Sequence, residues 1–192
     1  MHTIEPYYNW TSLYESATDE RSPLYGREYH DSLCTHTVYN YYIHPQWDEM
    51  GSSTLYLKIL FVDYNLGFCI IELMGEWNDC LYNDIMYLKQ NIAEPMMDEG
   101  INKFILIGDN VLNYHAAEND YYQEWFEEVE DGWIAILNLR DYIIKEFETI
   151  FVPNYIAMNG VLSHFNWRTF TPGQLLLQVE SLMVKRLSSH SY

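Results

Sequence analysis

The chain has 192 residues, of which 48% are hydrophobic and 17% aromatic, so it can bury one sizeable core and is too apolar for a disordered chain. Its 28 acidic residues outnumber its 10 lysines and arginines, which gives a formal net charge of −18. That charge repels nucleic-acid phosphates and anionic membrane surfaces, so we expect no nucleic-acid binding and no membrane binding.

The sequence favours a cytoplasmic location. No stretch approaches the roughly 20 apolar residues that cross a bilayer, and the start MHTIEPYYNWTSLYES lacks the basic and apolar regions of a secretory signal. The three cysteines, Cys34, Cys69 and Cys80, form no CxxC pair, which is typical of free thiols in a reducing compartment.

Residues 1–36 are predicted to form an irregular arm, and residues 37–192 a single α/β domain. The arm has few aliphatic residues and neither helical nor alternating periodicity, but it carries six aromatic residues: Tyr7, Tyr8, Trp10, Tyr14, Tyr25 and Tyr29. Because so many rings are unfavourable in water, we expect them to pack on the main domain or on a second subunit.

Strands are predicted next over 35–44, 53–64 and 67–77, the last two joined as an antiparallel hairpin through Asn65, Leu66 and Gly67. Asn78 or Asp79 can cap a helix over 79–94. In that helix four apolar residues recur at spacings of three and four on one face: Leu81, Ile85, Leu88 and Ile92.

Three β-α units follow, in which strands over 102–108, 132–139 and 153–162 precede helices within 117–131, 140–151 and 171–187. Strands that alternate with helices predict a parallel sheet covered by helices. The predicted fold class is therefore α/β, with a mixed sheet that begins with an antiparallel hairpin. We expect its core to contain Ile70, Leu73, Phe104, Leu106, Ile134 and Ile136.

This order of elements resembles that of SpoIIAA-like or STAS-like domains, known from anti-sigma-factor antagonists and the soluble parts of some anion transporters. The most similar stretch is 67–111, where a strand ending in Gly75-Glu76-Trp77 leads through a helix to a second strand and a turn. In the family's phosphorylation switches that turn carries an Asp-Ser pair. Here the matching turn begins at Asp109, and no serine or threonine occurs in 109–120, so the phosphorylation role is not expected.

The stretch GDNVLNYH, residues 108–115, is predicted to be a loop at the carboxyl end of a parallel strand, where open α/β sheets bind ligands. The candidate ligand-binding residues are Asp109, Asn110, Asn113 and His115. The alternative is that the stretch only forms a turn and a helix cap.

No GxGxxG, P-loop or GxSxG motif occurs, so we predict no catalytic residue and no cofactor. The densest group of histidine and cysteine lacks the paired spacing of zinc sites, so no metal is predicted either; it consists of His30, Cys34, His36 and His44.

The segment from Glu118 to Asp131 contains seven carboxylates and no lysine or arginine. A solvated helix face is the simplest interpretation. The alternative is a docking surface for a basic partner, made by Glu118, Asp120, Glu124, Glu127 and Glu128.

Because catalytic motifs are absent, the favoured function is a non-enzymatic interaction or regulatory module with a protein partner, basic if it docks on the acidic segment. Two alternatives stay open. One is a small-molecule-binding protein or enzyme with a pocket at the strand carboxyl ends, and the other is an acidic inhibitor of a basic protein. A homo-oligomer is also compatible with the sequence.

Overall fold

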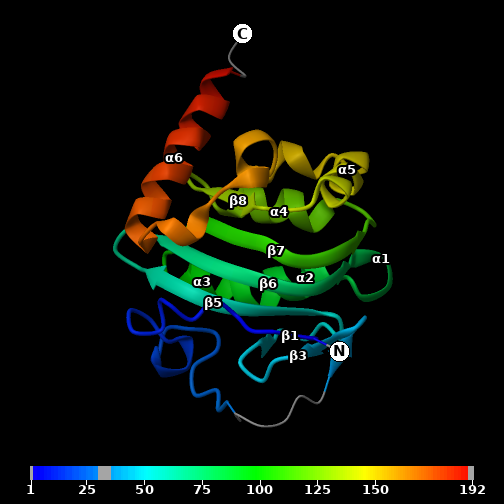
Figure 1. Ribbon diagram of the computed structural model, residues 1–192. Coiled ribbons are helices and arrows are strands. Elements are labelled where there is room, and N and C mark those ends of the chain that lie inside the picture. Colours follow the sequence, from blue (N-terminus) through cyan, green and yellow to red (C-terminus); the bar gives the residue numbers. More distant parts are fainter. Residues whose placement is uncertain (1, 30–35, 190–192) are drawn as a thin grey trace.

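A computed structural model describes residues 2–29 and 36–189, and its centre is a five-stranded sheet in the order β4-β5-β6-β7-β8 (Figure 1). The strands are β4 (Asp48–Glu49), β5 (Leu55–Asp63), β6 (Phe68–Asn78), β7 (Lys103–His115) and β8 (Trp133–Leu137). β5 pairs antiparallel with β4 and β6, whereas β6, β7 and β8 are parallel to one another. The predicted mixed sheet with an antiparallel start is therefore confirmed.

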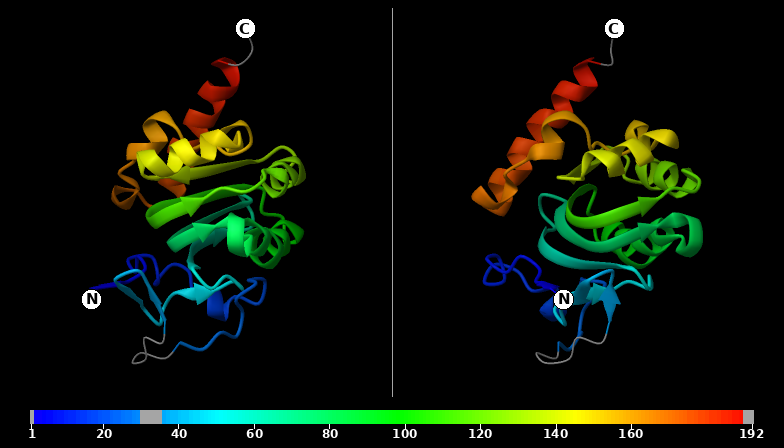
Figure 2. Two further views of the ribbon diagram at one scale, coloured as in Figure 1. Left: turned by 90° about the vertical axis from the view of Figure 1, so that its right-hand side faces the viewer. Right: turned by 45° about the vertical axis from the view of Figure 1, so that its right-hand side comes forward.

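Hydrophobic cores lie on both faces of this sheet, because successive side chains of each strand point to opposite sides. Ile71 and Leu73 of β6 belong to the core under α2 (Asp84–Leu88), α4 (Asp120–Glu128) and α5 (Asp141–Thr149). Phe68 and Ile70 belong to the core under α6 (Pro172–Ser189), which covers the other face (Figure 2). All six residues predicted for the core are buried.

The predicted helix over 79–94 is divided into short pieces. Asn78 caps α1 (Asp79–Tyr82), because its side chain accepts a hydrogen bond from Leu81 N at 2.9 Å. Asn83 then adopts a left-handed conformation with φ 54° and separates α1 from α2, which continues through a π-helical turn, η2 (Lys89–Ala93), into α3 (Glu94–Asp98). The break turns Leu81 outward, 74% exposed, so its placement on the buried face was wrong.

Two predicted strands also differ from the structure. The segment 35–44 is divided by Tyr39, with φ 53°, into β2 (Thr37–Val38) and β3 (Tyr41–Ile43), which form a small sheet with β1 (His2–Ile4). The segment 153–162 pairs with β8 only through the bridge from Ala157 to Ala135. Its two ends belong to the 3-10 helices η3 (Val152–Asn154) and η4 (Gly160–His164). At the first of these, Pro153 has no N–H to donate to a strand ladder.

The stretch 108–115, predicted as a loop, is instead the second half of β7. Its backbone pairs in parallel with β6 as far as the partners Asn78 and His115, and two register shifts accommodate its turn-forming residues. The loop that leads into α4 is therefore Ala116 to Asn119, which contains no hydroxyl side chain.

The N-terminal arm, including the 3-10 helix η1 (Ser16–Thr18), lies along the β4–β5 side of the sheet (Figure 1). The rings of Tyr7 and Trp10 pack edge-to-face on Trp167, with centroids 4.7 and 5.6 Å away. Tyr14 packs in the same manner on Phe61. Within the described part of the chain, no helix is long and apolar enough to cross a membrane.

Candidate functional site

Two of the predicted ligand-binding residues join a buried acid on the α6 face of the sheet. We call Glu72, Asp109, Asn110 and Arg168 the Glu72 cluster. Glu72 accepts hydrogen bonds from Tyr7 N at 2.7 Å and from Asn110 Nδ2 at 3.0 Å. Asp109 Oδ2 accepts from Arg168 Nη1 at 2.9 Å and from Trp167 Nε1 at 2.7 Å. Arg168 Nη2 also lies 3.8 Å from Glu72 Oε1, so it links the two acids.

A β-bulge in β7 brings the cluster together. Glu72 pairs with Ile107 and Met74 with Asn110, so Gly108 and Asp109 together lie opposite one residue of β6. Bulges re-aim side chains and are frequent beside functional sites. A larger residue at 108 would crowd Leu139, since a Cβ there would lie 2.6 Å from Leu139 Cδ2 and 3.2 Å from Leu137 O.

Burial dominates the electrostatics of Glu72, whose exposed fraction is 1%. Its pKa is raised from 4.5 to about 7, mainly by loss of hydration, and the charge of Asp109 acts in the same direction. The hydrogen bond from Tyr7 N, the charge of Arg168 and the hydrogen bond from Asn110 act in the opposite direction. Glu72 therefore titrates near neutral pH, which is a property of many functional carboxyl groups.

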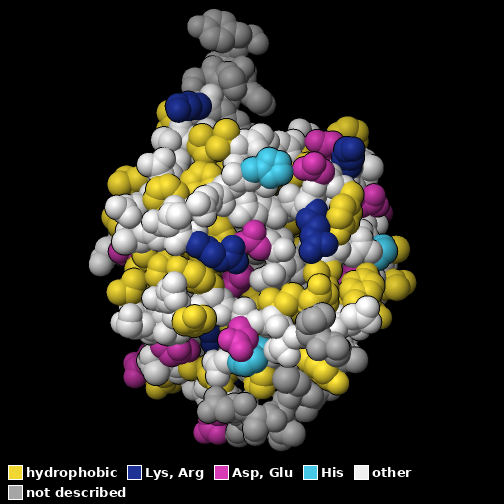
Figure 3. All heavy atoms as spheres, in the orientation of Figure 1, with side chains coloured by type: hydrophobic (Ala, Val, Ile, Leu, Met, Phe, Trp, Pro, Cys, Tyr) yellow, Lys and Arg dark blue, Asp and Glu magenta, His cyan; other side chains and the backbone are white. Residues whose placement is uncertain are grey.

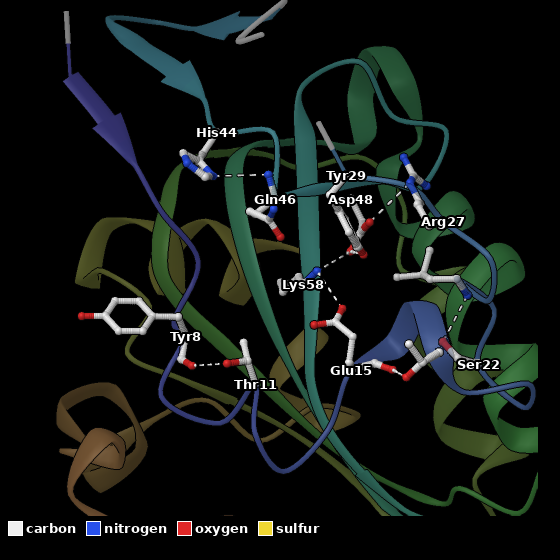
Figure 4. Close-up of polar contacts among 12 residues, drawn as sticks. Tyr8, Thr11, Glu15, Ser22, Arg27, Tyr29, His44, Gln46, Asp48 and Lys58 are labelled. Carbon is white, nitrogen blue, oxygen red and sulfur yellow. Dashed lines mark hydrogen bonds and ion pairs between the residues drawn. The ribbon is translucent and has the colours of Figure 1, made fainter. Parts of the chain in front are cut away.

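A buried polar stripe continues from Glu72 across the sheet, since Lys58 lies directly opposite it in the pairing of β5 with β6. Lys58 Nζ lies 3.6 Å from Asp48 Oδ2 and from Glu15 Oε1, and 3.8 Å from the centre of the Tyr29 ring (Figure 4). Tyr29 also donates its hydroxyl to Asp48 at 3.1 Å. The arm thus covers the stripe and binds it through side chains that the sequence places far from the strands.

The other two predicted residues lie elsewhere on β7. His115 Nε2 is 3.0 Å from Glu76 Oε1, and Asn113 Nδ2 donates to Tyr39 Oη at 3.3 Å. Met74, which belongs to a small apolar cluster, lies between Glu72 and Glu76 along β6. The four residues predicted as one ligand site therefore form two groups.

A second buried acid, Asp79, holds α1 onto the sheet. It accepts from Tyr122 Oη at 2.5 Å, Tyr114 Oη at 3.1 Å, Trp77 Nε1 at 3.0 Å and Ile85 N at 2.9 Å. Burial raises its pKa to about 6, and these four donors oppose that rise. Because both carboxylate oxygens are used inside the fold, we assign Asp79 a structural role.

A polar pocket of about 580 Å³ opens beside Asp109, where β8 ends. Residues 138–141, which follow β8, form one wall, and residues 163–166 form the other. This is the end of a parallel strand, where α/β sheets commonly bind ligands. The pocket is thus at the kind of position the sequence indicated, although of the four predicted residues it includes Asp109 alone.

A larger, mainly apolar groove of about 1340 Å³ lies beside the start of β8, at the opposite end of the strand from the polar pocket. Its walls come from Phe126 of α4 and Asp131 in the turn after it, from residues 153–162, and from the second half of α6. The groove was not predicted, because its residues are distant in sequence and one wall was expected to be a strand.

The acidic residues predicted for partner docking divide into two groups. Glu124 and Glu128 lie 3.5 and 2.8 Å from the ammonium group of Lys89, which is buried and also contacts Glu94. They therefore help to hold α4 against η2, the turn that contains Lys89. The remaining three, Glu118, Asp120 and Glu127, are exposed on α4 and its preceding loop.

Three or more metal-ligating side chains do not gather anywhere in the described parts of the chain. His30 and Cys34, considered above with His36 and His44, lie outside the described residues.

Comparison with known proteins finds similarity to solved structures. No family model matches it, and no curated protein matches it. It is similar to the solved structure of the anti-sigma factor antagonist SpoIIAA in its unphosphorylated form, with 12% identity, a TM-score of 0.44, and coverage of 65% of this chain and 96% of that one. It is also similar to the phosphorylated form of the Bacillus cell fate determinant SpoIIAA, with 12% identity, a TM-score of 0.37, and coverage of 52% and 87%. The resemblance to SpoIIAA noted in the sequence is thus also found by comparison of structures.

Proposed function

We propose that the protein is a non-enzymatic interaction module that binds a protein partner in the apolar groove beside β8. The groove itself carries this proposal. Large apolar side chains stand exposed around it, with exposed fractions of 62% for Val161, 66% for Val184 and 42% for Phe126. Apolar surface gathered around one concave site is characteristic of interaction surfaces.

The groove favours docking of side chains over addition of a strand. β8 is the edge of the sheet, but Ile136 N donates to Ala157 O at 2.8 Å and Ala157 N donates to Ile134 O at 3.0 Å. These bonds occupy the centre of the edge that an added strand would need. An amphipathic helix with its apolar face in the groove fits this arrangement.

The charge beside the groove favours a basic partner. Phe126 and Asp131 line the groove, and they belong to the segment with seven carboxylates and no lysine or arginine. The groove's own lining contains two lysines and two carboxylates: Lys103 is paired with Glu180 at 2.6 Å, and the other two are Lys185 and Asp131. Basic side chains on the flank of a docked helix would meet this excess of negative charge. The exposed residues Glu118, Asp120 and Glu127 are part of the proposed docking surface.

The proposal includes a cytoplasmic location. Cys69 and Cys80 are both free thiols, one buried and one exposed, as is typical of a reducing compartment.

Replacing Val161 with aspartate should weaken binding of a synthetic amphipathic leucine-lysine peptide by tenfold or more, because the new carboxylate would be desolvated against the apolar face. Anisotropy of the labelled peptide measures this. Leu66→Asp is the matched control, since Leu66 is 53% exposed at the β5–β6 turn, away from the groove, and should bind as the wild type does. A leucine-glutamate peptide should not bind. Equal affinity of the wild type and Val161→Asp would reject the groove.

A further inference from the structure

We propose that the polar pocket at the end of β8 is a second binding site, which takes a small polar ligand through an oxyanion, a carboxylate or a phosphate, held by Arg140. This site is separate from the protein-docking groove and does not depend on it. Only two of the nine residues that line the pocket, Leu139 and Phe165, are apolar. The remainder can bond to a ligand: Asp109, Asn138, Arg140, Asp141, Ser163, His164 and Asn166.

Arg140 has a charge that the protein itself does not neutralise. Among the described side chains, Arg140 has no ion pair with a carboxylate and donates only to Tyr142 Oη, at 3.3 Å. Six other cationic residues pair with a carboxylate: Arg21, Arg27, Lys58, Lys89, Lys103 and Arg168. Among the arginines whose side chains the structure describes, Arg140 alone lacks such a pair, and Lys145 is a lysine that also lacks one. Its planar group can bind an oxyanion through two parallel hydrogen bonds.

The pocket is not a basic patch, since Arg140 is the one lysine or arginine among the nine residues that line it. On the face shown in Figure 3, Lys and Arg side chains lie apart, separated by neutral and acidic ones. Nucleic acids and other large polyanions need contiguous positive charge, so this surface suits one small anionic group.

The carboxylates of the pocket limit the class of ligand. Asp109 is neutralised by Arg168 and by Trp167 Nε1, so its repulsion of an anion is reduced. Asp141 begins α5, where the helix dipole favours its negative charge. Both carboxylates can accept hydrogen bonds from hydroxyl or amino groups, and the Asn166 amide can accept or donate them. The pocket therefore suits a small molecule with such groups beside its oxyanion, more than a bare anion.

The two walls of the pocket are joined rigidly. Asn138 Nδ2 donates to Phe165 O at 2.8 Å, and Phe165 N donates to Asn138 Oδ1 at 2.6 Å. Asn138 N also donates to Leu162 O at 2.9 Å. These bonds hold Asn138 at φ 60°, a left-handed conformation that costs free energy and is frequent at binding sites. A pocket formed in advance loses little entropy when it binds a ligand.

Titration of inorganic phosphate and of succinate, followed by amide chemical shifts in NMR spectra, tests the site. We expect at least one of them to give saturable shifts in 138–141 and 163–166 at millimolar concentration, and the one that saturates identifies the oxyanion. Arg140→Gln should weaken this binding tenfold or more. Lys145→Gln is the control, since it removes the same charge from α5 outside the pocket and should bind as the wild type does.

Two results would overturn the site. One is that neither anion gives saturable shifts in the wild type. The other is that Arg140→Gln and Lys145→Gln weaken binding equally, because the effect would then come from net charge alone. The dispersion of the amide spectrum shows whether each variant is folded. The groove can fail its peptide test while this site passes, and the reverse also holds.

Discussion

Replacing Leu106 with alanine should lower the free energy of unfolding by about 2 to 5 kcal/mol. Leu106 is fully buried at the centre of β7, where it pairs with Ile71 of β6 and Ile136 of β8. Its side chain lies in the core between the sheet and the helices α2 to α5. Alanine would leave a cavity that strands on both sides prevent from collapsing, so we expect the cost to exceed the transfer energy of the lost methyl groups.

Urea denaturation of the wild type and the variant measures this loss. Leu177→Ala is the matched control, because Leu177 is 64% exposed on α6 and should change the stability by less than about 0.5 kcal/mol. If Leu106→Ala also changes it by less than about 0.5 kcal/mol, β7 does not lie in the centre of the sheet.

The parts of the fold that the sequence predicted well are those with strong local patterns. The apolar run around Leu106 indicates a strand, and the patterns of 132–139 and 140–151 indicate a strand followed by a helix. These elements formed as β7, β8 and α5. The segment 153–162 has a similar apolar content but no place in the ladder apart from Ala157. Its conformation is set by packing between β8 and α6, which no local pattern reports.

β7 is longer than the local sequence pattern predicted, whereas the strand predicted over 153–162 did not form. Asp109, Asn110 and Asn113 are residue types that favour turns, so a loop was the reasonable prediction. The neighbouring strand β6 continues to Asn78 and pairs with β7 as far as His115. Two register shifts accommodate the residues that fit a regular strand poorly. Tertiary pairing therefore overrode local preference.

Two members of the Glu72 cluster, Glu72 and Arg168, were missed, although the sequence contained one signal for Glu72. Glu72 is a single acid within the apolar run FCIIELM, and Lys58 is a single base within LYLKILFV. Charged residues in strands that are buried on both faces need partners, so a polar stripe across the hairpin could have been predicted. Tyr7 and Arg168, which contact Glu72, lie outside the sheet towards opposite ends of the chain, and only the folded structure identifies them as its partners.

The wild type should lose stability as the pH rises and Glu72 ionises, and replacing Glu72 with glutamine should remove this loss. The pKa of Glu72 is raised from 4.5 to about 7 by burial, so the folded state holds its proton more tightly than the unfolded state does. Stability from this group is therefore full below pH 4.5 and is lost as the pH rises through 7. The loss should be on the order of 2 to 3 kcal/mol between pH 5 and pH 8.

The measurable quantity is the difference in unfolding free energy between Glu72→Gln and the wild type, followed by urea denaturation over that pH range. As the pH rises, the unfolding free energy of the variant should increase relative to that of the wild type, because glutamine cannot ionise in the buried site. This trend is expected whatever the difference between the two proteins is at pH 5. Glu118→Gln removes an equal charge from an exposed position, so its curve should run parallel to that of the wild type. If the curve for Glu72→Gln also runs parallel to that of the wild type, the carboxyl group of Glu72 does not titrate inside the fold. The arrangement in which the arm buries the polar stripe would then be rejected.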